Sequence, residues 1–188
     1  MLVYTSLVRR RAMRGCGSGN IVHRPLSATW GFVSMGSGCR IAPGCRIEGV
    51  ARHAGTAYSP HIVFGDRVSV EQRCTIVAAS TLAIGSDTTI SYDVTITDLD
   101  HQYQAIGTHV LRQPITVRTT SIGPNCFIGA GARILAGTTL GRQCVVGANA
   151  VVRGNYPDFS VLTGNPARTV RRYDDLVGKW RRIDEAAL

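Results

Sequence analysis

Residues 122–152 read IGPNCFIGAGARILAGTTLGRQCVVGANAVV, and this stretch repeats a pattern every six residues. The first position of each repeat is aliphatic, and glycine follows it in four of the repeats. The aliphatic residues are Ile122, Ile128, Ile134, Leu140, Val146 and Val152. A step of six equals three strand periods of two and does not fit the 3.6-residue period of an α-helix. We therefore expect each repeat to form one short strand followed by a corner, with one side chain pointing inward.

Earlier parts of the chain keep the same phase. Two blocks, 64–76 and 84–96, follow the pattern closely, and a weaker block covers 35–47. Three repeats close a coil of 18 residues, and stacked coils pair as parallel strands around a continuous core. The scattered short strands of a β-sandwich would not stay in phase for so long. The sequence thus predicts an all-β protein whose residues 35–170 form a parallel β-helix.

The cysteines fit this pattern. Five of the six occupy the small inward position of a repeat: Cys39, Cys45, Cys74, Cys126 and Cys144, leaving Cys16 outside it. Cys126 and Cys144 are one coil apart. Disulfides or a zinc site are the alternatives, but no CxxC occurs. We expect free thiols that fill the core.

Three segments lack the repeat. Residues 97–121 form a long insertion, and long loops in compact folds are usually functional. Residues 1–34 are expected to form a separate N-terminal cap. In the tail at 171–188, Tyr173, Leu176, Val177, Trp180 and Ile183 have helical spacing, which predicts a short amphipathic C-terminal helix.

The composition suits a single globular domain of 188 residues with 21 Lys and Arg against 12 Asp and Glu. Such a balance is compatible with nucleic acid, an anionic small molecule, or an acidic membrane surface or polysaccharide as partner. The cations gather at the two ends: Arg9, Arg10, Arg11, Arg14, Arg168, Arg171, Arg172, Arg181 and Arg182. The middle of the chain has no basic stripe with interleaved aromatics, so we expect no nucleic acid partner.

No stretch is apolar over the roughly 18–20 residues that span a bilayer, and the start is too short for a secretory signal. We expect a cytoplasmic protein.

The run at 122–152, followed by FSVLTGNPARTVRRYD at 159–174, resembles the hexapeptide-repeat acyltransferases. This resemblance implies a left-handed β-helix, homotrimers with active sites between subunits, and an acyl-CoA donor. The stretches TDLDHQY at 97–103 and RRYDDLVGKW at 171–180 are most similar to enzymes that acetylate bacterial surface polysaccharides.

Moving an acetyl group to a hydroxyl requires a base, and a neutral imidazole suits this role near pH 7. Of the five histidines, only His101 and His109 lie in the insertion. His101 matches the family position of the catalytic histidine, and Asp98 or Asp100 is placed to orient its ring. The alternative is a solvated surface histidine.

A metal site of the kind in hexapeptide-repeat carbonic anhydrases would need histidines from adjacent coils. His101 is 8 residues from His109 and 40 from His61, and neither separation is a multiple of 18. We expect no metal.

The resemblance also assigns residues to the acetyl-CoA donor. Ala130 and Ala148, 18 residues apart, match the positions that contact the pantetheine arm. Arg168 and Arg171 match those that reach the nucleotide phosphates, where arginine makes charge-assisted contacts. After Val152 many relatives continue with Thr-Lys-Asp, whereas this chain has Arg153, Gly154 and Asn155. Arg153 is therefore expected to supply the cation that the lysine provides in those relatives. Corner packing and a solvated basic tail are the alternatives for these residues.

The acceptor side departs from the family. Relatives that act on simple sugars often have an acidic pair where this chain has Ala78 and Ala79, so Glu71 is the candidate replacement. Phe127 stands where relatives usually have Trp and is a candidate acceptor contact.

These features favour an O-acetyltransferase that transfers acetyl from acetyl-CoA to a saccharide hydroxyl in surface polysaccharide biosynthesis. The basic ends suggest peripheral contact with a membrane-bound glycan. Three alternatives remain open: N-acetylation of an amino-sugar nucleotide, acetylation of an antibiotic, and a non-catalytic scaffold. An acceptor panel separates the enzymes, and the scaffold predicts loss of the loop histidine or of the GNPAR motif at 164–168.

Overall fold

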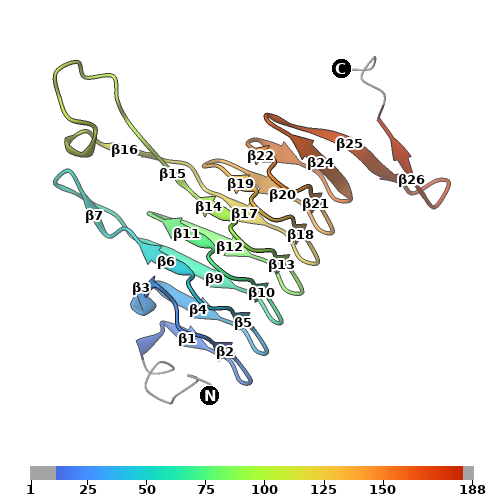
Figure 1. Cartoon of the computed structure of the whole chain (residues 1–188), viewed down its shortest axis with the longest axis horizontal. Helices are drawn as coiled ribbons and strands as arrows, with labels where there is room; N and C mark the ends of the chain where they lie inside the picture. Colours follow the sequence, from blue (N-terminus) through green and yellow to red (C-terminus); the bar gives the residue numbers. More distant parts are fainter. Residues whose placement is uncertain (1–11, 184–188) are drawn as a thin grey trace.

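The computed structural model describes residues 12–183, which form a left-handed parallel β-helix with almost no helix (Figure 1). Three sheets run along the solenoid, and the chain passes from sheet A to sheet B to sheet C in each coil. The predicted all-β fold is thus confirmed. Sheet A contains β1 (Gly15–Cys16), β4 (Val33–Met35), β9 (His61–Phe64), β12 (Thr81–Ile84), β17 (Ser121–Ile122), β20 (Thr139–Leu140) and β23 (Asn155–Tyr156).

Sheets B and C complete each coil. Sheet B contains β2 (Ile21–Val22), β5 (Arg40–Ile41), β10 (Ser69–Val70), β13 (Thr89–Ile90), β18 (Phe127–Ile128), β21 (Val145–Val146), β24 (Ser160–Gly164), β25 (Ala167–Asp174) and β26 (Lys179–Arg182). Sheet C contains β3 (Ser27–Ala28), β6 (Arg46–Gly49), β11 (Thr75–Ala78), β14 (Thr95–Thr97), β19 (Arg133–Ile134) and β22 (Val151–Val152).

The core is built from the repeated aliphatic position. In sheet B, Ile128 pairs with Val146, and in sheet C, Ile134 pairs with Val152, so the inward side chains stack coil upon coil. The six residues at the repeated aliphatic position of 122–152 are each at most 2% exposed. Burial of this kind is worth about 1.5–3 kcal/mol for each large aliphatic side chain, so these columns supply much of the stability.

The cysteines are free, as predicted, and five of them are fully buried: Cys39, Cys45, Cys74, Cys126 and Cys144. Cys16 is half-buried in the first coil. The thiols therefore act as small core residues.

The expected boundary of the N-terminal cap at residue 34 is wrong. The strands β1, β2 and β3 pair in parallel with β4, β5 and β6, so residues 15–28 already form a coil. Cys16, Val22 and Ala28 keep the step of six, but only Val22 is a branched aliphatic residue, which hid the repeat. The remainder of the predicted cap, residues 1–11, lies outside the described residues, and so do Arg9, Arg10 and Arg11.

The insertions leave the solenoid at one corner, between sheet C and sheet A. The predicted insertion at 97–121 contains an antiparallel pair, β15 (Leu99–His101) and β16 (Ile115–Val117), and the short 3-10 helix η2 (Val110–Arg112). A second, unpredicted hairpin of β7 (Arg52–His53) and β8 (Thr56–Ala57) leaves the same corner earlier in the chain. The two project on the same side of the solenoid (Figure 1). The 3-10 helix η1 (Trp30–Phe32) lies at this corner after the first coil.

The predicted C-terminal helix is wrong, because β25 and β26 form an antiparallel hairpin that extends sheet B. Tyr173 pairs with Trp180 across the hairpin, and their rings lie 5.7 Å apart. The spacing that suggested a helix therefore arises from cross-strand pairing. The Asp174 carboxylate accepts hydrogen bonds from the backbone N–H groups of Leu176 and Val177 in the turn. Residues 184–188 of the predicted helix lie outside the described residues.

Across residues 12–183, no helix is long and apolar enough to cross a membrane.

Candidate active site

His101 ends strand β15, where it pairs with Ile115 of β16. Its side chain is exposed and lines a cavity of about 460 Å³ between the two inserted hairpins, on the outer face of sheet C. Arg46, Glu48, Arg52 and His53 supply the other polar walls of this cavity. Among residues 12–183, no group makes a hydrogen bond to the His101 imidazole.

Asp98 does not orient His101, contrary to the expectation. Its side chain is fully buried, and its two carboxylate oxygens accept hydrogen bonds from the backbone N–H groups of Ala79 and Ser80, each at 2.8 Å. The Ser80 hydroxyl donates a third, at 2.7 Å. Asp98 thus holds the tight turn by which the preceding coil passes from sheet C to sheet A. A buried carboxylate requires such donors, which explains its position.

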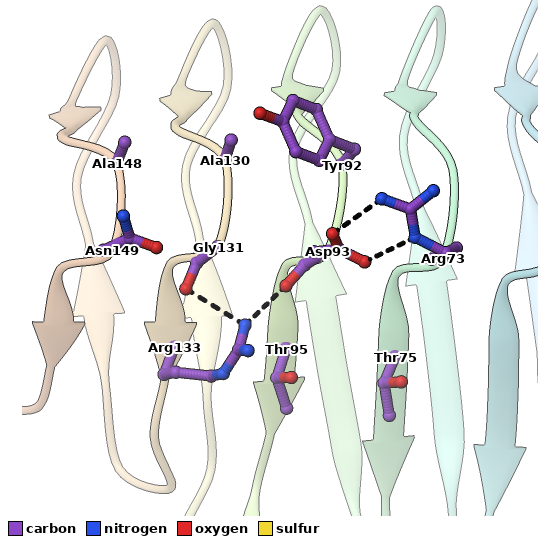
Figure 2. A pocket seen from close by; sticks show the side chains of 10 residues that line it. All are labelled: Arg73, Thr75, Tyr92, Asp93, Thr95, Ala130, Gly131, Arg133, Ala148 and Asn149. Atoms are coloured by element: carbon purple, nitrogen blue, oxygen red, sulfur yellow. Dashed lines mark hydrogen bonds and ion pairs between the residues drawn. The ribbon is translucent and has the colours of Figure 1, made fainter.

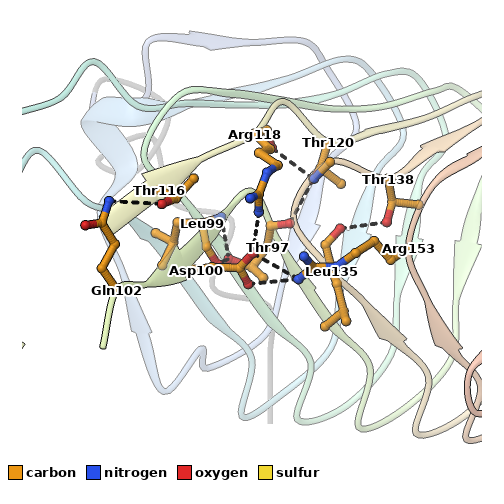
Figure 3. A network of polar contacts seen from close by, with 11 residues as sticks. Thr97, Leu99, Asp100, Gln102, Thr116, Arg118, Thr120, Leu135, Thr138 and Arg153 are labelled. Atoms are coloured by element: carbon orange, nitrogen blue, oxygen red, sulfur yellow. Dashed lines mark hydrogen bonds and ion pairs between the residues drawn. The ribbon is translucent and has the colours of Figure 1, made fainter. Parts of the chain in front are cut away.

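Asp100, the other candidate orienter, is engaged by two arginines (Figure 3). Its carboxylate accepts hydrogen bonds from Arg118 at 2.8 Å and from Arg153 at 2.9 and 3.0 Å. Arg153, expected at the donor phosphates, therefore lies beside the base of the inserted hairpin. These three residues line a further cavity of about 390 Å³ together with His101. The network fixes the strand that carries the histidine rather than the imidazole itself.

A second histidine that the sequence reasoning missed lies next to His101. The rings of His53 and His101 have centroids 5.0 Å apart and an interplanar angle of 69°. The Nε2 atom of His53 is 3.0 Å from the backbone oxygen of Gln113, and because a carbonyl only accepts, Nε2 carries the proton. Local sequence gives no sign of this pairing, because the two histidines are 48 residues apart.

The small residues expected at the donor arm lie together in a groove at the corner between sheets B and C (Figure 2). Ala130, Gly131 and Ala148 form one end of this groove, whose volume is about 420 Å³. Gly129 beside them has no room for a side chain, since a Cβ there would lie 2.7 Å from the backbone nitrogen of Ala148. Because Ala130, Gly131 and Ala148 have small side chains or none, this end of the groove leaves space for a narrow chain such as pantetheine.

The groove reaches toward His101 along the outer face of sheet C. Tyr92 occupies the corner position of Ala130 one coil earlier, and Arg73 forms an ion pair with Asp93 at 2.8 Å beside it. Thr95 lines both this groove and the cavity that contains His101. The two hollows therefore meet on one face of the solenoid.

Of the two arginines expected at the donor phosphates, Arg168 lines a cavity of about 290 Å³ at the C-terminal end of the solenoid. Tyr156 and Arg172 share this cavity, and burial raises the pKa of Tyr156. Arg171 lies on β25 opposite Val161 of β24. Arg172, known from the sequence only as part of the basic tail, is thus the second arginine of the cavity.

The two acceptor candidates lie away from His101. Glu71 stands at the corner between sheets B and C, where its carboxylate accepts a hydrogen bond from the Ser69 hydroxyl at 3.3 Å. Phe127 is 47% exposed on the outer face of sheet B. The carboxylate that shares a cavity with His101 is Glu48, which forms an ion pair with Arg46 at 2.6 Å. Residues 12–183 contain no group of three or more His, Cys, Asp and Glu side chains that could hold a metal ion.

Comparisons with known proteins agree with this architecture. Residues 119–154 match the family description "Bacterial transferase hexapeptide (six repeats)", which confirms the resemblance seen in the sequence. The chain is 43% identical over 76 residues to Rv3034c of Mycobacterium tuberculosis, a protein named a probable acetyltransferase. It is 38% identical over 61 residues to WbbJ of Escherichia coli, a candidate lipopolysaccharide biosynthesis O-acetyltransferase. These matches cover 40% and 32% of this chain but only 25% and 31% of the two relatives.

Among solved structures, the fold is similar to AntD, an N-acyltransferase from Bacillus cereus crystallised as a point mutant with dTDP and coenzyme A. The TM-score is 0.77 at 14% sequence identity, and the alignment covers 94% of each chain. This similarity establishes a shared fold.

Proposed function

We propose that the chain is an acetyltransferase that transfers an acetyl group from acetyl-CoA to a saccharide hydroxyl, with His101 as general base. One observation carries the proposal: the exposed imidazole of His101 lines a cavity that meets the small-residue groove of Ala130 and Ala148 at Thr95. Bound acetyl-CoA supplies the acetyl group in activated, thioester form. The names of Rv3034c and WbbJ, and the coenzyme A bound to AntD, support the choice of donor.

In this proposal the residues of the chain bind, orient and move one proton. A ring nitrogen of His101 takes the proton of the acceptor hydroxyl, whose oxygen forms the new bond to the acetyl carbon, and the protonated imidazole returns the proton to the departing sulfur. The Asp100–Arg118–Arg153 network holds the hairpin that carries His101.

The donor is assigned to the groove and the basic end of the solenoid. Ala130 and Ala148 hold the narrow arm against open backbone, and Arg168 and Arg171 contact the phosphates through charge-assisted hydrogen bonds. Thermal unfolding tests this assignment. At a 100-fold excess over Kd, acetyl-CoA should add about 2.7 kcal/mol, a Tm increase of roughly 5–10 °C. The increase should shrink in Arg168→Ala/Arg171→Ala and persist in His101→Ala. Absence of any shift would favour a scaffold.

We further propose that the active site is completed between subunits of a homotrimer. His101 lies beside sheet C, whereas the candidates Phe127 and Arg171 lie on sheet B, another face of the solenoid. A second copy would bring such faces together, as closed symmetric oligomers do.

Mixing two defective variants tests this arrangement. Co-assembly of His101→Ala with Arg168→Ala/Arg171→Ala protomers, assayed at limiting acetyl-CoA, should restore about a quarter of the wild-type sites, because one interface in four then has both intact halves. If His101 and the arginines serve the same protomer's site, mixing restores nothing beyond the sum of the two variants.

The acceptor is proposed to be a saccharide used in surface polysaccharide biosynthesis, which the name of WbbJ supports. The second candidate is N-acetylation of an amino-sugar nucleotide, and the overall likeness to AntD favours it. A panel of neutral hydroxyl sugars and nucleotide-linked amino sugars, with release of free thiol as the readout, separates the two. Preferential turnover of the amino sugars would overturn O-acetylation.

A further inference from the structure

The two inserted hairpins leave the same corner but not from successive coils. One follows β6 and the other follows β14, while β11 between them passes into sheet A through the tight turn at Ala79 and Ser80. Because β6, β11 and β14 are neighbours in sheet C, the hairpins are two strand spacings apart, about 10 Å. The cavity of about 460 Å³ between the hairpins, which we call the slot, lies at this corner, and Val77 of β11 is among the residues that line it.

His53 stands at the wall of this slot opposite His101. Its hairpin turns at Ala54 and Gly55, which both have positive φ, at 45° and 82°. Such a two-residue turn matches the twist of its strands and fixes the direction in which they project. Half-buried, His53 donates from Nε2 to the Gln113 backbone oxygen across the slot at 3.0 Å.

The acceptor of that hydrogen bond is the residue that organises the inserted loop. Gln113 is 5% exposed, and its side-chain amide donates to the backbone oxygens of Thr108 at 2.8 Å and Ala105 at 3.2 Å. Its side-chain oxygen accepts from the Ala105 N–H at 3.0 Å. His53 thus connects the first hairpin to the part of the second that the Gln113 hydrogen bonds hold together.

His101 needs a neighbour that limits its rotation, and the two expected candidates are engaged elsewhere. Asp98 binds the turn at 79–80, and Asp100 binds two arginines. Among the described residues, the ring that contacts the His101 imidazole is that of His53, in an edge-to-face arrangement. We propose that His53 is the positioning residue of His101. This inference rests on the proposed function for its catalytic part.

Three substitutions of His53 separate its two contacts. His53→Ala removes both the ring contact and the hydrogen bond, His53→Phe keeps a ring, and His53→Gln keeps a donor for the Gln113 oxygen. We expect His53→Ala to lower kcat by about 10–100-fold, the usual effect of losing a group that orients a reactive one, with the KM for acetyl-CoA nearly unchanged. Phe or Gln should restore most of this loss, and the better of the two identifies the dominant contact. The matched control is His109→Asn, in the same loop, which should keep wild-type kcat.

A second measurement does not depend on turnover. In NMR spectra of the imidazole protons, assigned by replacing each histidine in turn, His53→Ala should shift the His101 signals, and the wild-type protein should show a nuclear Overhauser effect between the two rings. His109→Asn should leave both unchanged. Unmoved His101 signals, or wild-type kcat in His53→Ala, would overturn the positioning role. If the rings are coupled but no acceptor is turned over, the proposed function fails while the positioning role stands.

Discussion

The uninterrupted coils at 121–152 and the decorated corner at 50–60 and 97–121 satisfy different requirements. In the coils, each strand repeats the demands of the one before it, and Ile128 and Ile134 have equivalents one coil later in Val146 and Val152. At the corner no residue has an equivalent, and His101, His53 and Gln113 are held by contacts that occur once. We expect the free energy of unfolding to depend mainly on the repeated positions and catalysis on the unrepeated ones, which substitutions can test.

The largest expected effect is on chemistry at the corner. His101→Ala should lower kcat by about 10²–10⁴-fold, the usual contribution of a general base. The side chain is exposed, so the free energy of unfolding should change by no more than about 0.5 kcal/mol. Steady-state kinetics with a responsive acceptor and a thermal melt check both halves. Near-normal turnover would exclude His101 as the base.

The next effect is on stability in the coils. Ile134→Ala empties a fully buried position and should cost about 2–5 kcal/mol, or a Tm decrease of roughly 4–20 °C for a chain of this size. Thr139→Ala, an exposed position on β20, the next strand along the chain, is the control and should leave Tm unchanged. A large loss of kcat in the Ile134 variant, assayed well below its Tm, would contradict the expected separation of stability in the coils from catalysis at the corner.

Asp98 lies where the two regions meet, because it belongs to the insertion but holds a turn of the preceding coil. Because its carboxylate accepts three hydrogen bonds from the turn at 79–80, Asp98→Asn should cost about 2–3 kcal/mol of stability. Its kcat should stay within a few-fold of wild type, since the carboxylate does not contact His101. Loss of kcat as deep as in His101→Ala, at unchanged Tm, would instead restore the catalytic role expected from the sequence.

The smallest effect concerns an exposed ion pair at a corner of the coils. The hydrogen bond from Arg73 holds the pKa of Asp93 below its ordinary value. A lowered carboxyl pKa stabilises the fold above the ordinary pKa of about 4, and this contribution is lost as the pH falls through the lowered value. Asp93→Asn should therefore lower Tm slightly at pH 7, and the difference from wild type should vanish in acid. Melts at a series of pH values check this, and a difference that grows in acid would contradict it.

The regular coils could be predicted because their inward aliphatic residues recur every six residues along the chain. The first coil was missed because Cys16 and Ala28 are too small to mark it, and the C-terminal hairpin because Tyr173 and Trp180 have a spacing that suits both a helix and a cross-strand pair. His101 could be named as a candidate because it interrupts the repeat in a recognisable motif. Whether Asp98 points to the histidine or into a turn depends on the preceding coil, which local sequence does not encode. The contact between His53 and His101 likewise joins hairpins that leave different coils, so local sequence does not encode it.

The position of the insertion also bears on the order in which the solenoid assembles. Between uninterrupted coils, paired residues such as Phe127 and Val145 are 18 positions apart, but Thr95 and Arg133, on either side of the inserted hairpin, are 38 apart. Closing a loop of twice the length costs only about 0.6 kcal/mol more, yet most of the contacts that hold a solenoid together join one coil to the next. We expect the coils within residues 121–162 to fold first and the strand pairing across the insertion to form late. The pairing between Thr95 and Arg133 should therefore be the first to separate under denaturing conditions.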